Sequence, residues 1–151
     1  PPTAQTRNRD ALRAEVATAK VPPGIIAYLN DEPVGWSRVM PRNDVNGVAR
    51  NRALRRILDD DPGAWWIVCF AVQQRHRNTG IASALLAACV DHARSQGATC
   101  IEGHPVDTSR LKTERVSGSA LFTGTMNTFT NAGFDEIART YPSRPIMRLN
   151  L

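Results

Sequence analysis

The chain has 151 residues, of which 42% are hydrophobic and 22% are charged, and its formal net charge is +5. This length and balance are typical of one globular domain, residues 1–151, and not of a disordered or fibrous protein. The longest apolar run, residues 81–90, is about half of the ~20 residues that span a bilayer. With no pattern of a signal peptide, we expect a cytoplasmic protein without a membrane partner.

The positive charge would suit a polyanionic ligand, but it is scattered along the chain. All basic residues except Lys20 and Lys112 are arginines. A nucleic-acid-binding protein more typically shows a basic stripe with interleaved aromatic residues, so nucleic acid is a disfavoured partner. Cys69, Cys89 and Cys100 lie in apolar segments without metal-ligand spacing. We therefore predict buried, reduced thiols and no metal site.

The first 64 residues predict a helix, a hairpin and a long connection. An amphipathic helix is expected over residues 10–20, followed by strands at 25–29 and 34–39 with residues 30–33 as their turn. Residues 40–64 predict a helix with one buried face, which is either a lid over a ligand site or, as we favour, a packed surface helix with solvated arginines. Its apolar stripe consists of Val48, Ala53, Leu54, Ile57 and Leu58.

The central part of the chain predicts a buried strand, a polar turn and a helix. Residues 65–72 are a continuous bulky run, as in a strand buried on both faces. From Ile81 onwards apolar residues recur at helical spacing, and Gly97 supplies a stop.

The first turn of that helix has the features of an anion site. Its amide groups are unpaired and carry the positive end of the helix dipole. Gly80 and Ala82 leave room for a phosphate, Thr79 and Ser83 add hydroxyls, and Arg77 adds a charge suited to phosphate oxygens.

These residues resemble the acetyl-coenzyme A loop of the GNAT N-acetyltransferase superfamily, Gln/Arg-x-x-Gly-x-Gly/Ala. Arg77, Gly80 and Ala82 fill the three motif positions. Asn78 stands where the family commonly has Gly, and Gln74 where it commonly has Pro.

The resemblance implies an α/β fold with a mixed, mostly antiparallel sheet flanked by helices. A central parallel strand-helix-strand crossover would bind acetyl-coenzyme A. The family's first strand and helix have no counterpart here, so we expect them to be missing, either because the chain is N-terminally truncated or because the protein begins abruptly. The implied activity is direct transfer of the acetyl group to a primary amine of a small molecule or peptide, with a homodimer as the implied assembly.

The resemblance also implies the cofactor contacts. Backbone groups of Phe70, Ala71 and Val72 would bind the pantetheine arm, and an amide near Phe70 would polarise the thioester carbonyl. The expected contacts are Phe70, Ala71, Val72, Arg77, Asn78, Thr79, Gly80, Ile81, Ala82, Ser83 and Phe129.

Residues 98–106 predict the parallel partner strand, with Cys100, Glu102 and His104 on one face. A lysine-like amine has a pKa near ~10.4, so a base or a water chain must take its proton. Glu102 is the first candidate base, because this superfamily often places an acidic residue on that strand. His104 is the second candidate and Asp107 the third. The alternatives are an ion-paired Glu102 and a packed His104.

The C-terminal part predicts a loop at 106–121, a short helix within 122–134 and strands at 135–139 and 145–151. The family tyrosine that often protonates the departing thiolate falls on Phe129, which could pack against the coenzyme but has no proton to donate. Either a hydroxyl of Thr123, Thr125 or Ser119 serves, or the thiolate leaves without an acid.

Two other functions stay open. Phe129 and the absent N-terminal elements would suit a non-catalytic acyl-coenzyme A binding or sensing module. A basic nucleic-acid-associated protein is the weaker alternative, and salt-sensitive binding to unrelated DNA would identify it.

Overall fold

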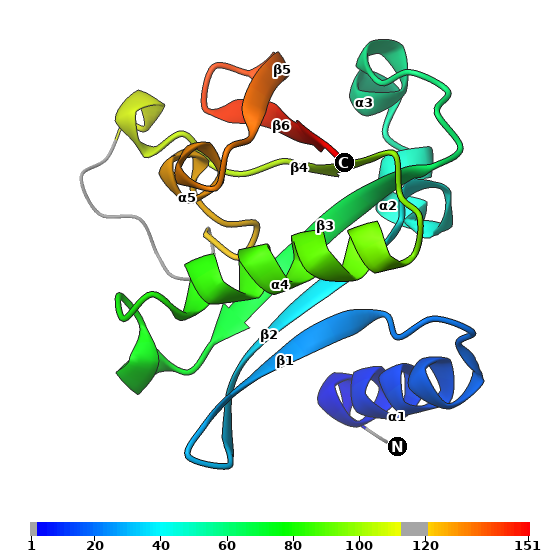
Figure 1. Ribbon diagram of the computed structural model, residues 1–151, viewed down its shortest axis with the longest axis vertical. Coiled ribbons are helices and arrows are strands. Elements are labelled where there is room, and N and C mark those ends of the chain that lie inside the picture. The colour runs from blue at the N-terminus through cyan, green and yellow to red at the C-terminus, as the bar shows by residue number, and fades with distance from the viewer. Residues whose placement is uncertain (1–2, 113–120) are drawn as a thin grey trace.

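A six-stranded sheet forms the centre of the computed structural model, which describes residues 3–112 and 121–151 (Figure 1). The strand order is β1-β2-β3-β4-β6-β5, and β3 and β4 run parallel while the other neighbouring pairs are antiparallel. This confirms the predicted mixed sheet and its parallel crossover. The strands are β1 Gly24–Leu29, β2 Glu32–Pro41, β3 Ala64–Val72, β4 Cys100–Gly103, β5 Asp135–Tyr141 and β6 Arg144–Asn150.

Helices lie on both faces of this sheet. The crossover helix α4 lies across one face, and α1 lies beside the β1–β2 hairpin (Figure 1). Within the described ranges, none of the helices is both long enough and apolar enough to cross a membrane. The helices are α1 Ala4–Thr18, α2 Asn46–Ala49, α3 Arg52–Ile57, α4 Ile81–Ser95 and α5 Met126–Asn131, with 3-10 turns η1 Arg42–Asp44, η2 Gln74–His76 and η3 Thr108–Arg110.

Helix α1 begins six residues earlier than predicted. The Thr3 hydroxyl caps it by accepting a hydrogen bond from the Thr6 amide, so Asp10 is an interior residue and not the start. The helix buries none of its residues fully. An ion pair connects it to the sheet, in which Arg38 of β2 donates to both oxygens of Glu15, at 2.7 and 2.9 Å.

The β1–β2 turn is shorter than predicted. Asn30 and Asp31 both have positive φ, 49° and 66°, as a two-residue hairpin turn requires. Asn and Asp accept this conformation more readily than other residues with a side chain. The second strand therefore begins at Glu32, and the predicted four-residue turn is wrong.

The long connection holds two short helices where one was predicted. Val48 of α2 and Leu54 of α3 pack with Val45 against Trp66 and Ile146 of the sheet. The packing favours the surface-helix interpretation of this segment over the lid.

The main core lies between α4 and the sheet. Leu85, Leu86 and Cys89 of α4 are buried against Ile67 of β3 and Ile101 of β4. Gly97, at φ +77°, ends the helix as predicted. Cys89 and Cys100 are buried free thiols and Cys69 is half-buried, and burial raises the pKa of Cys89 to about 11.

The C-terminal elements follow the prediction with shifted bounds. Helix α5 occupies only residues 126–131, and the two last strands form a hairpin. The strand predicted at 98–106 is shorter, because β4 ends at Gly103. Ser119, one of the proposed proton donors, lies outside the described residues.

Candidate functional site

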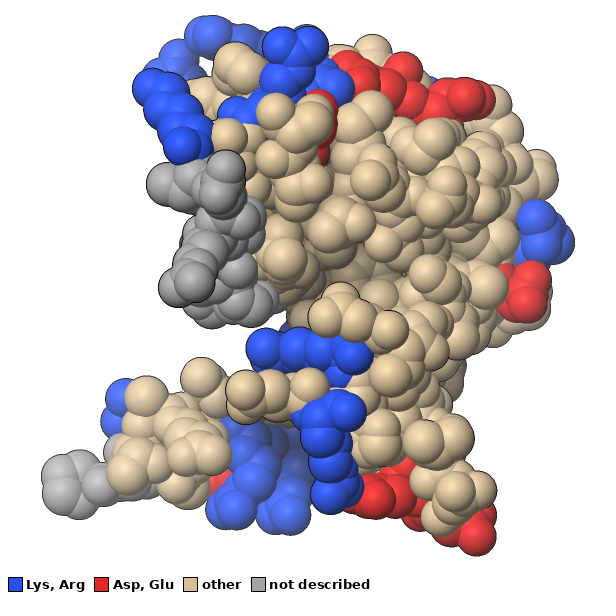
Figure 2. Space-filling view, turned by 90° about the vertical axis from the view of Figure 1, so that its left-hand side faces the viewer, with Lys and Arg blue, Asp and Glu red and all other residues tan. Residues whose placement is uncertain are grey.

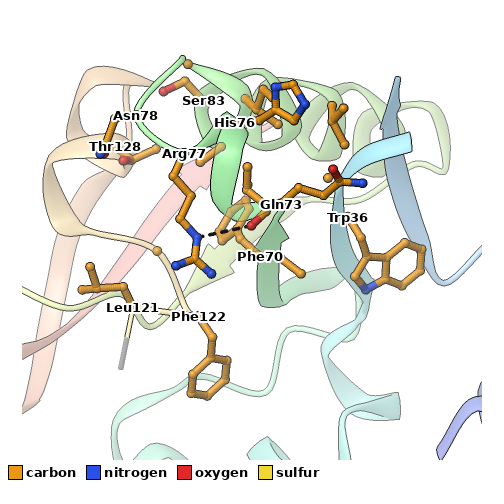
Figure 3. A pocket seen from close by; sticks show the side chains of 18 of the residues that line it. Trp36, Phe70, Gln73, His76, Arg77, Asn78, Ser83, Leu121, Phe122 and Thr128 are labelled. Carbon is orange, nitrogen blue, oxygen red and sulfur yellow. Dashed lines mark hydrogen bonds between the residues drawn. The ribbon is translucent and has the colours of Figure 1, made fainter. Parts of the chain in front are cut away.

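A cavity of about 970 Å³ opens at the C-terminal end of β3, around the turn that leads into α4 (Figure 3). Its walls come from the first three strands, the turn, the start of α4 and residues 121–128. The predicted cofactor contacts among its lining residues are Phe70, Ala71, Val72, Arg77, Asn78, Gly80, Ile81, Ala82 and Ser83.

The turn before α4 forms an open anion cradle. Ala84 is the first residue whose amide finds a helical acceptor, the carbonyl of Gly80 at 3.0 Å. Within the described chain, the amides of residues 78–83 have no hydrogen-bond acceptor. Gly80 adopts φ +88°, and a Cβ built on it would meet nothing within 4 Å. The free amides and the helix dipole together favour a bound anion here.

Asn78 explains one departure from the family motif. Its φ is 60°, in the left-handed region that Gly enters freely and Asn enters more readily than most residues. The turn therefore keeps its shape without the usual Gly. The neighbouring Thr79 donates its hydroxyl to the His76 carbonyl and does not line the cavity, unlike the other predicted loop residues.

Arg77 reaches into the middle of the cavity, where its Nε donates to the Val72 carbonyl at 3.3 Å (Figure 3). Of the described lining residues, Arg77 alone has a permanently charged side chain, and none is Asp or Glu. The cavity is therefore suited to a ligand with negative charge near its centre.

Strands β3 and β4 part at this end of the sheet. They pair only from Ala64 to Ile67 on the β3 side, and β3 then continues to Val72. The segment at 121–126 lies in the gap. The amide of Phe70 donates to the Phe122 carbonyl at 2.6 Å. On the other side, the amide of Val106 donates to Gly124 at 3.0 Å. The amide expected to polarise a thioester is thus engaged with the chain itself.

Phe129 lies behind this gap and not at the cavity surface. It is fully buried, and its ring meets Phe70 and Phe134 edge to face, with centroids 6.2 and 5.0 Å apart. Gly103 makes room for the ring, since a Cβ there would lie 2.4 Å from it. Phe129 therefore supports Phe70 from within the core, one layer away from where a coenzyme would lie.

Glu102 is fully buried outside the cavity lining and is held by two arginines. Its Oε2 accepts from Arg42 at 2.8 Å, and its Oε1 accepts from Nε of Arg148 at 2.8 Å. Asp59 joins the same two arginines, at 3.0 and 2.8 Å. Burial disfavours the guanidinium charges, but the carboxylates outweigh it and raise the pKa of both arginines. This geometry favours the ion-paired interpretation of Glu102 over the general base.

His104 and Asp107 are also engaged away from the cavity lining. His104 lies beside Trp66 and Thr140, with its Nε2 2.7 Å from the Thr140 hydroxyl. Burial, with the charge of Arg144, lowers the pKa of His104 to about 4, so it is neutral at pH 7. Asp107 accepts hydrogen bonds from Ser109 and Arg139, which keep its pKa below the usual range.

Of the proposed proton donors, Thr125 lines the cavity and caps α5, whereas Thr123 accepts a hydrogen bond from Arg144 at 3.0 Å. Sequence reasoning missed the partners of Glu102, because no local pattern gives the register that places Arg148 opposite it in β6. It also missed the lining residues on the side away from α4, Ile26, Trp36, Leu121 and Phe122.

Comparison with known proteins gives both a family and a fold. A family model described as "Acetyltransferase (GNAT) family" matches residues 2–113. No curated protein sequence matches the chain significantly.

Many solved structures share the fold. The ribosomal-protein-alanine N-acetyltransferase from Brucella melitensis has a TM-score of 0.61 at 15% identity, covering 97% of this chain and 78% of that one. The structure of yncA from Salmonella typhimurium with its cofactor acetyl-CoA has a TM-score of 0.62 at 16% identity, covering 99% of this chain and 76% of that one. The aminoglycoside acetyltransferase AAC(6')-Ib in complex with coenzyme A has a TM-score of 0.63 at 19% identity, covering 99% of this chain and 77% of that one. At these identities the likeness concerns the fold alone.

Proposed function

This chain belongs to the GNAT acetyltransferase family, and from that premise we propose that it transfers the acetyl group of acetyl-coenzyme A directly to a primary amine of a small molecule or peptide. The observation that carries the proposal is the open cradle before α4, where the amides of residues 78–83 lack acceptors in the described chain and Gly80 leaves the approach clear. Neighbours of the same fold whose structures contain acetyl-CoA or coenzyme A support it.

The residues present fit the coenzyme. The cradle amides would hold its pyrophosphate, with Arg77 close enough to add a charge. The edge of β3 beyond Ile67, from which β4 has parted, would receive the pantetheine arm. Bound there, the coenzyme supplies the thioester whose carbonyl the Phe70 amide would polarise once the Phe122 carbonyl has left it.

The amine must lose a proton before it attacks. No described carboxylate lines the cavity, and Glu102 is held by two arginines, so we propose that water in the cavity carries this proton away. Glu102 and His104 as bases stay predictions. With Phe129 buried, the thiolate would leave without a dedicated acid or with help from Thr125, which lines the cavity.

The other expectations extend this proposal. We propose that residues 1–151 form one domain, because one sheet holds strands from residue 24 to residue 150. The homodimer rests on the resemblance, and the cytoplasmic location rests on the lack of a signal-peptide pattern and on cysteines in apolar segments. Light scattering of the purified protein would show whether it is a homodimer.

Exchanging Gly80 for Glu tests the proposal. A side chain at φ +88° is strained by ~1–2 kcal/mol, and its carboxylate would repel the phosphates in the cradle. We expect Gly80→Glu to weaken acetyl-coenzyme A binding by about a hundredfold or more and to abolish transfer, as measured by calorimetry and by thiol release with a panel of amines.

The matched control is Gly97→Glu at the other end of α4. Gly97 has a similar φ of +77° and equally open surroundings, so it carries the same strain without facing the cavity. Equal binding by wild type and Gly80→Glu would refute the proposed site.

The second candidate function is the acyl-coenzyme A sensing module. Phe129 in the tyrosine position and the Phe122 carbonyl on the Phe70 amide both favour it. Tight coenzyme binding without transfer to any amine of a broad panel would select the sensor over the enzyme.

A further inference from the structure

The cavity has two halves of different chemistry. His76, Asn78, Ser83 and Thr128 line the half near the start of α4 (Figure 3). The side chains of Trp36 and Phe122 point away from α4, on the other side of the sheet (Figure 3). The alternation of side chains along β2 supports this placement of Trp36. A Cβ on Gly35 would touch Ile81 and Leu85 of α4, so the next residue, Trp36, lies on the face of the sheet away from α4. The coenzyme cradle occupies only the polar half.

The far half is apolar. Its lining residues include Ile26, Trp36, Leu121 and Phe122. Ile26 is 49% and Phe122 is 51% exposed, although both are large and hydrophobic. The Trp36 ring is held in place against β1, because a Cβ on Gly24 would lie 2.2 Å from it. A concave apolar surface with a fixed aromatic ring is typical of a ligand pocket.

Charge around the far half disfavours a polycation. The cavity lining contains Arg77 and, in the described chain, no carboxylate. Of the acids of α1 and the hairpin, Asp10, Glu15 and Glu32 are paired with Arg9, Arg38 and Arg75, and Asp31 lies in the hairpin turn outside the cavity lining. In the space-filling view, Lys and Arg side chains lie around the hollow of this face (Figure 2). A second ammonium group would therefore lose hydration without gaining a partner.

We infer that the acceptor is a monoamine carried on an aromatic or bulky apolar group, which packs against Trp36 and Phe122 in the far half of the cavity. The inference rests on the proposed function and names its substrate class. The apolar group would hold the amine at the end of the pantetheine channel, beside Phe70, where the acetyl group would arrive.

Calorimetry on the coenzyme A-loaded protein tests this without requiring turnover. We expect 2-phenylethylamine to bind at least about tenfold more tightly than 1,4-diaminobutane, since burial of an aromatic ring outweighs a second charge here. Trp36→Ala should weaken 2-phenylethylamine binding by about tenfold or more. Phe122→Ala, at a half-exposed position that tolerates truncation, should do the same. Tyr141→Ala is the control, because that aromatic side chain is 70% exposed and lies outside the cavity lining.

The outcomes separate the two proposals. Coenzyme A binding should stay within about twofold of wild type in Trp36→Ala and Tyr141→Ala, since neither residue lies in the cradle or in residues 121–126. The acceptor inference is wrong if 1,4-diaminobutane binds as tightly as 2-phenylethylamine. It is also wrong if Trp36→Ala and Phe122→Ala both bind 2-phenylethylamine as tightly as wild type does. In either case the transferase proposal stands. If the wild type binds no coenzyme A, the proposed function fails and the acceptor inference fails with it.

Discussion

His104 illustrates how tertiary surroundings set the state of a single residue. Its ring is packed beside Trp66 and bonded to Thr140, and the guanidinium of Arg144 adds an unfavourable charge. These neighbours bring its pKa to about 4, whereas an exposed histidine titrates near ~6.5. A neutral imidazole at pH 7 could accept a proton, but this one is bonded and outside the cavity lining.

The lowered pKa of His104 predicts a pH dependence of folding stability. As pH falls, the unfolded chain takes up this proton first, so the contribution is complete above about pH 6.5 and is lost toward pH 4. We expect the free energy of unfolding to fall by about 2 kcal/mol between pH 7 and pH 5 from this residue, as measured by urea titration. In His104→Asn this part of the dependence should vanish. Equal pH dependence in the two proteins would contradict the assignment.

At the scale of elements, the gap between β3 and β4 is the feature that joins fold to function. Residues 121–126 fill it with three backbone hydrogen bonds, from Phe70 to Phe122, from Val106 to Gly124 and from Met126 to Val106. Pantetheine on the free edge of β3 would compete with the first of these bonds. On the proposed function, the Phe122 carbonyl would therefore leave the Phe70 amide when the coenzyme binds.

Hydrogen exchange with mass spectrometry measures that movement. On addition of acetyl-coenzyme A, we expect faster exchange in peptides covering Val106 and Met126, because their acceptors are withdrawn, and slower exchange at Phe70. The β5–β6 hairpin serves as the internal control and should not change. Increased protection of residues 121–126 would show that the segment stays in place and that the Phe70 amide never reaches the thioester.

At the scale of the whole molecule, the cluster around Glu102 connects parts that lie far apart in the sequence. Arg42 follows β2, Asp59 lies just before β3, Glu102 is in β4 and Arg148 is in β6. Because both arginines are largely buried beside Glu102, removing this central carboxylate leaves them to share the half-exposed Asp59 as a charged partner.

We therefore expect Glu102→Gln to lower the free energy of unfolding by about 3 to 5 kcal/mol, as measured by denaturant titration. The control Asp91→Asn breaks an exposed pair with Arg94 and should change stability little. Acetyl transfer per folded molecule should be retained. Loss of transfer at an unchanged unfolding midpoint would instead support Glu102 as the general base.

Local pattern alone was sufficient for the order strand, turn and helix from residue 64 to residue 95. Hydrophobic periodicity and the Gly97 stop depend on residues close in sequence, so the bounds of α4 and the candidate phosphate cradle could be predicted. The hairpins were found for the same reason. Errors occurred where a local cap or turn was misread, as at Thr3 and at Asn30-Asp31.

What only the tertiary structure decided involves partners from distant segments. Alternation placed Glu102 and His104 on one face of a strand, but the neighbouring strand β6 brings Arg148 to the carboxylate and the turn η1 brings Arg42. The Phe122 carbonyl at the Phe70 amide and the apolar wall around Trp36 likewise depend on sheet register and loop path. Periodicity carries no information about either, because register and loop path are set by long-range packing and not by neighbours in the sequence.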